Sequence, residues 1–185
     1  ITVNLDASGN ATIAPSDVLT AAPADNCAIA GVTLSRSAFT CADLGSVNVT
    51  VTATDASGNA ASCNAVVTIA DPFTTAIGAG PDAEICTTQP TYLISGASAS
   101  NMTLAWSTSG SGTFSDPAAV NPVYTRGATD LTEVTLTLTG TKLNGCPETL
   151  ADAMTLKFTG EPSASAGTDK DLCSGTTTVT LSDAT

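Results

Sequence analysis

The side chains of this chain that could do chemistry are six cysteines and a set of carboxylates, with no histidine among them. Ser-His-Asp and Cys-His catalysis both need an imidazole base, so neither arrangement can form within the chain. The cysteines form no C-x-x-C pair, and the usual zinc spacings are absent as well. Cysteines this far apart in a Thr- and Ser-rich sequence are typical of disulfides in an oxidising compartment. They are Cys27, Cys41, Cys63, Cys86, Cys146 and Cys173.

The carboxylates do not form an obvious catalytic pair. A glycosidase needs two carboxyl groups that converge across a cleft. Here the acids stand singly in predicted turns, where we expect water to solvate them: Asp6, Asp17, Asp25, Asp43, Asp55, Asp116 and Asp130. Narrow β-sandwich domains also lack deep pockets. We therefore predict that the chain is not an enzyme.

The charge balance excludes two classes of partner. The chain carries 17 acidic and 5 basic side chains, for a net charge of −12. Nucleic acids and anionic lipids need clustered Lys and Arg, whereas these cations are scattered singly. No apolar run approaches the roughly 18 residues of a membrane span. We expect neither nucleic-acid binding nor membrane insertion.

Calcium is the one cofactor that the loops suggest, because oxygen-rich loops at domain ends can bind it. The candidates are Asp55 and Asn59 in one loop, Asp25 and Asn26 in another, and the acids near a domain joint, Asp71, Asp82 and Glu84. The string Asp-Ala-Ser-Gly-Asn occurs twice, at 6–10 and 55–59. The same string is also typical of a tight turn without metal, which is the favoured interpretation.

Apolar and polar residues alternate in short runs, the pattern of β-strands with one buried face. One such run holds Val47, Val49 and Val51; the next holds Cys63, Ala65, Val67 and Ile69, and residues 55–59 predict a hairpin between them. Later runs contain Val134, Leu136 and Leu138, then Met154, Leu156 and Phe158. Trp106, Phe158 and Tyr124 are the expected aromatic core residues. The pattern predicts an all-β fold of immunoglobulin-like sandwiches.

Pro- and Gly-containing stretches mark two boundaries, at 71–72 and 160–162. The segments that follow them, 79–86 and 166–173, match each other with an offset of 87 residues. That period is about one sandwich long. We expect domains at 1–71, 72–161 and 162–185, the last being only the opening of a repeat. Short linkers predict tandem domains arranged end to end, within a chain that continues beyond both ends.

Residues 25–27 (Asp-Asn-Cys) and 49–63 resemble the hyalin-repeat (HYR) family of immunoglobulin-like modules. Residues 1–13 look like the variant found in giant Bacteroidetes surface proteins. The family's cysteine upstream of the first strand is missing here. The second domain is similar to the PKD/Ig-like repeats of the same proteins, on residues 80–86, 104–116, 121–124 and 134–138.

The resemblance implies an extracellular, cell-surface protein, similar to the gliding-motility adhesins that flavobacteria export by type IX secretion. It implies that the modules contact neighbouring repeats of the same chain, and surface glycans or other cell-surface proteins.

These modules also imply a disulfide pattern. Cys86 and Cys146 are the two cysteines of the second domain and are expected to pair. In the first domain a Cys27–Cys41 bond is favoured, leaving Cys63 for the missing upstream cysteine. The rival is Cys41–Cys63 with Cys27 left over, and the sequence leaves the choice open. Cys173 would find its partner beyond residue 185.

Three functions follow. The leading hypothesis is a non-catalytic structural spacer of a surface adhesin. The first alternative is a ligand- or glycan-binding module, which would need exposed aromatic side chains; those not assigned to the core are Phe39, Phe73 and Phe114. The second alternative is an accessory module of a secreted enzyme.

Overall fold

The structure is a computed structural model, and it describes residues 1–26, 28–160 and seven scattered positions after residue 160. Cys27, Cys173 and nearly all of the predicted third domain, 162–185, lie outside the described residues. The predicted roles of these residues therefore stay predictions.

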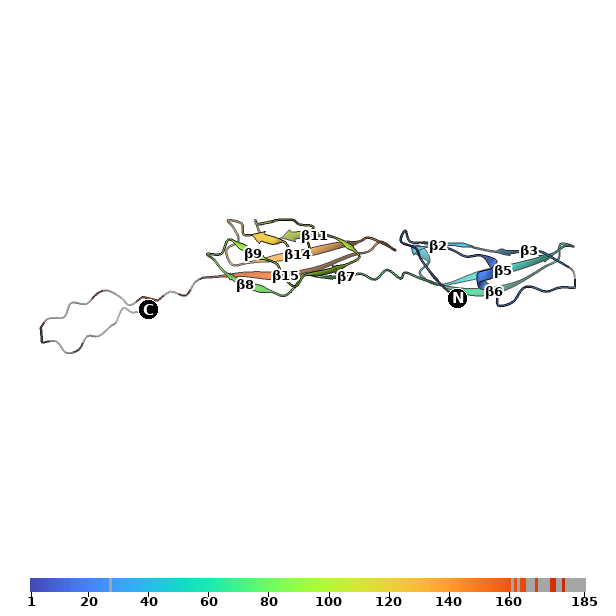
Figure 1. The fold of residues 1–185 in the computed structure, drawn as a ribbon, viewed down its shortest axis with the longest axis horizontal. Coiled ribbons are helices and arrows are strands. Elements are labelled where there is room, and N and C mark those ends of the chain that lie inside the picture. The colour runs from blue at the N-terminus through green and yellow to red at the C-terminus, as the bar shows by residue number, and fades with distance from the viewer. Residues whose placement is uncertain are drawn as a thin grey trace.

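The described residues form two β-sandwiches that follow each other end to end (Figure 1). The predicted all-β, tandem sandwich fold is confirmed. Within the described residues, helix is confined to two single turns, α1 (Pro15–Val18) and the 3₁₀ turn η1 (Cys41–Asp43).

The first sandwich has a four-stranded sheet in the order β1-β6-β5-β3, covered in part by the two-stranded sheet β2-β4. Its strands are β1 Thr2–Asn4, β2 Asn10–Thr12, β3 Ile29–Leu34, β4 Ala38–Thr40, β5 Gly45–Asp55 and β6 Ala60–Ala70. The β5–β6 hairpin turns at the predicted loop, 55–59. β1 pairs in parallel with the end of β6, so the chain enters and leaves this sheet along neighbouring strands.

The second sandwich packs a sheet in the order β11-β14-β15-β8 against β12-β13-β9, with the pair β10-β7 beside them. Its strands are β7 Ala76–Gly78, β8 Ala83–Cys86, β9 Thr91–Leu93, β10 Ser98–Ser100, β11 Met102–Thr108, β12 Thr113–Phe114, β13 Val123–Thr125, β14 Glu133–Lys142 and β15 Thr149–Thr159. The long β14–β15 hairpin turns toward the first sandwich.

Each sandwich has its own core. The predicted alternation is confirmed in both: Val49 and Val67 are buried in the first, and Leu136 and Leu156 in the second. Trp106, Tyr124 and Phe158 are buried as expected. Phe39, left outside the predicted core, is buried in the first sandwich. It fills the centre of the small β2-β4 sheet, where period-2 alternation over three residues gives little signal.

The expectation that turn acids are solvated is wrong for Asp55, which is 5% exposed, and most clearly for Asp130, which is only 2% exposed. The Asp130 carboxylate accepts hydrogen bonds from the Tyr124 hydroxyl at 2.6 Å, the Ser111 amide at 2.7 Å and the Gly127 amide at 2.8 Å. Burial acts to raise the pKa of Asp130, but these donors outweigh it and the pKa is lowered. A buried carboxylate is tolerated here because its oxygens are satisfied.

Candidate functional site: the joint between the sandwiches

The tip of the β14–β15 hairpin, residues 143–148, reaches the first sandwich. The Cys146 side chain is 9% exposed and packs in the first sandwich's core cluster, although Cys146 belongs to the second sandwich by sequence. The Gly145 amide donates a hydrogen bond of 2.9 Å to the Ala7 carbonyl. The hairpin tip therefore caps the end of the neighbouring core.

A disulfide joins Cys146 to Cys41 in the turn η1, with the two Cα atoms 5.4 Å apart. This bond crosses the joint and covalently ties one sandwich to the other. The predicted Cys86–Cys146 bond is wrong, and so are both pairings considered for Cys41, with Cys27 and with Cys63. Cys63 and Cys86 are exposed free thiols.

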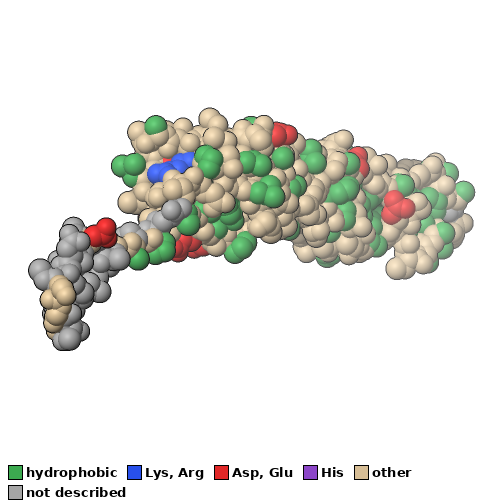
Figure 2. All heavy atoms as spheres, turned by 60° about the vertical axis from the view of Figure 1, so that its left-hand side comes forward, with side chains coloured by type: hydrophobic (Ala, Val, Ile, Leu, Met, Phe, Trp, Pro, Cys, Tyr) green, Lys and Arg blue, Asp and Glu red, His purple; other side chains and the backbone are tan. Residues whose placement is uncertain are grey.

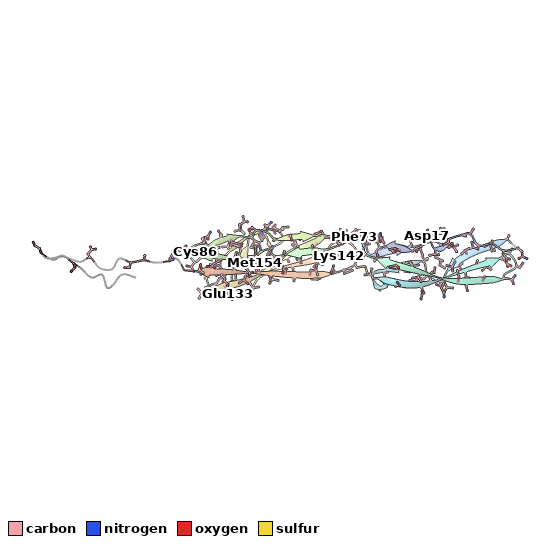
Figure 3. The ribbon with its side chains drawn as sticks, turned by 90° about the horizontal axis from the view of Figure 1, so that it is seen from below. Asp17, Phe73, Cys86, Glu133, Lys142 and Met154 are labelled. Carbon is pink, nitrogen blue, oxygen red and sulfur yellow. A yellow bond between two sulfur atoms is a disulfide. The ribbon has the colours of Figure 1, made fainter. Side chains whose placement is uncertain are left out.

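Strand geometry explains why Cys86 cannot bond Cys146. Cys86 pairs in register with Thr159, at the end of β15 far from the hairpin tip. Ten strand steps separate Thr159 from Thr149, which is roughly 33 Å at the rise of a β-strand. A disulfide needs Cα atoms within about 7 Å. Figure 3 shows Cys86 at the end of the second sandwich that points away from the joint, and Lys142 at the end facing it.

Asp71, one of the calcium candidates, lies in the linker between β6 and β7 and is held by the hairpin. One carboxylate oxygen accepts from Lys142 Nζ at 2.8 Å and from the Cys146 amide at 2.9 Å. The other accepts from the Phe73 amide at 3.0 Å. The hydrogen bond from Lys142, followed by that from Cys146, lowers the pKa of Asp71 to about 2. The ammonium group of Lys142 therefore provides the positive charge beside this carboxylate.

Two glycines allow the close approach at the joint. Gly9 has φ +76°, and a Cβ there would lie 2.6 Å from Cys41 Sγ. Gly145 has φ +85°, and a Cβ there would lie 2.5 Å from an Asp71 carboxylate oxygen. Only glycine combines this backbone conformation with the absent side chain.

The two Asp-Ala-Ser-Gly-Asn strings form the same turn. Asp6 Oδ1 accepts from the amides of Ser8 and Asn10, both at 2.9 Å. Asp55 Oδ1 accepts from the amides of Ser57 and Asn59, both at 2.8 Å. The hydrogen bonds from the Asn59 side chain and amide lower the pKa of Asp55. This is the turn chemistry expected of the sequence.

The structure brings Asp25 beside Asp55 and Asn59 around a hollow of about 380 Å³. Asn26 is exposed, and its amide donates to Asp25 Oδ1 at 2.7 Å. Among the described residues, no three His, Cys, Asp or Glu side chains stand close enough to hold a metal ion. Calcium binding at these loops stays a prediction, which a calorimetric titration would test.

The remaining calcium candidates are not at this joint. Asp82 Oδ1 accepts from the Thr155 amide at 2.7 Å, and Glu84 pairs in register with Lys157 on β15. Asp82 and Glu84 therefore lie beside strand β15 of the second sandwich and do not approach Asp71. Figure 2 likewise shows acidic side chains scattered over the visible face.

The aromatic side chains, all of which lie in the described part of the chain, are buried or half-buried. Phe73 and Phe114 are half-buried; the Phe114 ring centroid lies 5.8 Å from that of Trp106 and 5.2 Å from that of Tyr124. The surface thus offers no aromatic platform of the kind a glycan-binding module uses. In the same described residues, no helix has the length and apolar content needed to cross a membrane.

No protein-family model and no curated protein sequence matches the chain. The solved structures with which the chain shows a low similarity include cadherin repeats. Human protocadherin-24 EC1-2 has 14% identity and a TM-score of 0.38, over 87% of this chain and 95% of that one. Mouse cadherin-23 EC22-24 has 16% identity and a TM-score of 0.37, over 63% and 43%. The chain spans 42% of protocadherin gammaB7 EC3-6 and 35% of protocadherin gamma B2 EC3-6.

Proposed function

We propose that this chain is a non-catalytic spacer in the stalk of a secreted, cell-surface adhesin that serves adhesion or gliding motility. The observation that carries the proposal is the joint. Two sandwiches stand end to end, a disulfide joins their facing ends, and a nearly buried ion pair fixes the linker between them to the second sandwich. Such a joint fixes the orientation of one domain relative to the next, so that successive domains form an extended stalk. We also propose that the domains span residues 1–71 and 72–161 and that a further repeat begins at residue 162.

Extracellular location is supported by the cross-joint disulfide, because such bonds form and persist in oxidising compartments. The HYR- and PKD-like motifs support a surface protein of the type IX secretion kind. The glycan-binding alternative is less well supported, since no aromatic side chain is exposed. Contacts with neighbouring repeats follow from the end-to-end arrangement.

The test is a replacement within the parent surface protein. In one strain, residues 1–160 are exchanged for two unrelated sandwiches of equal length; in another they are deleted. Attachment and surface movement are then measured. A spacer predicts that the equal-length exchange retains activity and that the deletion reduces it. Loss in the exchanged strain, with normal surface display, would instead identify a binding module.

A further inference from the structure

The joint divides into contacts that fix the hairpin tip and linker to the second sandwich, and contacts that cross to the first. The tip is braced by Asn101, whose side-chain oxygen accepts from Asn144 Nδ2 at 2.9 Å and whose carbonyl accepts from the Leu143 amide at 3.0 Å. At the other end of the linker, the Thr75 hydroxyl donates to Glu148 at 2.8 Å. Together with the Asp71 contacts, these bonds make the linker part of the second sandwich.

Few contacts cross to the first sandwich. In the described part of the chain, the bonds that cross include the Cys41–Cys146 disulfide and the hydrogen bond from the Gly145 amide to the Ala7 carbonyl. The Cys146 side chain also packs in the first sandwich's core cluster, and Gly9 lies against the Gly145 carbonyl. The main chain crosses between Ala70, the last residue of β6, and Asp71. If the disulfide opened, the second sandwich, its tip and the linker could turn as one body about that peptide segment.

We propose that the Cys41–Cys146 disulfide is a thiol-controlled lock on a hinge at residues 70–71. When the bond is formed, the two sandwiches are one rigid rod. A dithiol reductant cleaves it: one reductant thiolate attacks a protein sulfur and releases the other cysteine as a thiolate, and the reductant's second thiolate then attacks the reductant sulfur of the resulting mixed disulfide and releases the remaining cysteine. The protein gains two thiols and the reductant becomes a cyclic disulfide. The sandwiches stay folded, but their relative orientation is then free.

The location of the bond suits this role. Cys41 is half-buried and Cys146 is almost enclosed, so we expect a dithiol to attack first at the Cys41 sulfur. Each cysteine lies outside the strands of its sandwich, Cys41 in the turn η1 and Cys146 in the hairpin tip, so opening the bond breaks no strand pairing. The lock would act at this joint whatever load the rod carries.

The two exposed free thiols, Cys63 on the first sandwich and Cys86 on the second, provide labelling sites on either side of the hinge. In a Cys27→Ser/Cys173→Ser background they accept a donor and an acceptor fluorophore through thioether bonds, which survive reductants. Single-molecule energy transfer is expected to show one narrow population in the oxidised protein and a broad one after dithiothreitol. Reoxidation with oxidised glutathione should restore the narrow population.

The variant Cys41→Ser/Cys146→Ser should give the broad population without reductant. Hydrogen exchange of β5 and β14, together with Trp106 fluorescence, checks that both sandwiches remain folded. Overlapping narrow distributions in this variant and the oxidised protein would overturn the proposal, because other contacts would then hold the joint. So would unfolding of either sandwich on reduction, or resistance of the bond to dithiothreitol in the folded protein.

Discussion

Lys142 Nζ lies 2.8 Å from the carboxylate of Asp71, and the two side chains are only 7% and 11% exposed. The pair connects the second sandwich's hairpin to the linker across 71 residues of sequence. Charges so far removed from water are stable only with a partner, because removing one leaves the other desolvated and unpaired. The ion pair therefore fixes the path of the linker.

Replacing Lys142 with Met should lower the free energy of unfolding by about 2–3 kcal/mol, somewhat less than for a fully buried pair. The matched control is Lys157→Met, which removes the same charge from an exposed position of β15. That control should change stability by less than about 0.5 kcal/mol. Guanidinium denaturation of the two variants measures the difference, and equal effects would contradict this account of the pair.

The same pair predicts a specific pH dependence. The pKa of Asp71 is lowered from 3.8 to about 2 in the folded protein. Its stabilising contribution is therefore complete above the unfolded pKa, near 4, and is lost as the pH falls through about 2. Asp43, Asp55 and Asp130 also have lowered pKa values and titrate in the same direction. The quantity to measure is therefore the difference in the free energy of unfolding between the native protein and Asp71→Asn. This difference should become smaller as the pH falls from 4 to 2. A constant difference would show that Asp71 stays charged or contributes nothing.

The disulfide connectivity can be determined by alkylation of free thiols and by mapping of disulfide-linked peptides. Alkylation without reduction should modify Cys63 and Cys86, while proteolysis should release Cys41 and Cys146 as one linked peptide. Removing the bond in Cys41→Ser/Cys146→Ser should lower the free energy of unfolding by about 4.7 kcal/mol, on the chain-entropy estimate for a loop of about 100 residues. Calorimetry should then show two separate unfolding transitions, one for each sandwich. Trp106 fluorescence should report only the transition of the second sandwich.

Cys86→Ser is the control for this experiment, because Cys86 is exposed and forms no bond. It should leave both the linked peptide and the unfolding transition unchanged. A linked peptide containing Cys86 and Cys146 would restore the connectivity expected from the sequence and overturn the joint described above.

Alternation and turn chemistry made the sandwiches predictable. Val49, Val67, Leu136 and Leu156 alternate with polar residues, and burial follows a period of two wherever one face of a strand meets a core. The loop at 55–59 was predictable because Asp and Gly at these positions encode one turn. These features depend on neighbours in sequence.

The joint was not predictable, because its contacts join residues from different modules. The disulfide spans 105 residues, and its formation depends on how the two sandwiches stand relative to each other. Cys146 belongs to the second sandwich by sequence, yet the hairpin places its side chain in the core of the first. The burial of Asp130 was not predictable for a related reason: no pattern in the neighbouring sequence shows that the Tyr124 hydroxyl and the Ser111 amide converge on its carboxylate.

Asp130→Ala should be among the most destabilising changes in the second sandwich. It leaves the Tyr124 hydroxyl and the amides of Ser111 and Gly127 without their acceptor. We expect the free energy of unfolding to fall by about 3 kcal/mol or more. Denaturation monitored by Trp106 fluorescence measures this change. Asp116→Ala is the control, since Asp116 is exposed and accepts mainly from the nearby Ala118 amide. A similar loss in both variants would mean that the buried network adds nothing beyond an ordinary turn.

The same substitution in each of the two Asp-Ala-Ser-Gly-Asn turns distinguishes the cost of backbone strain from the cost of crowding at the joint. Gly9 and Gly58 occupy the same position of the two turns, with φ of +76° and +90°. Gly58→Ala meets open space and should cost only the left-handed backbone penalty, about 1–2 kcal/mol.

Gly9→Ala carries that penalty and also places a Cβ 2.6 Å from Cys41 Sγ. It should therefore cost about 1–3 kcal/mol more. It should also reduce the fraction of protein with the Cys41–Cys146 bond, measured by mass spectrometry of unreduced peptides. Equal stability losses and full disulfide formation in both variants would show that the joint yields to the added methyl group, and that the close approach of Gly9 to Cys41 is not required for the bond.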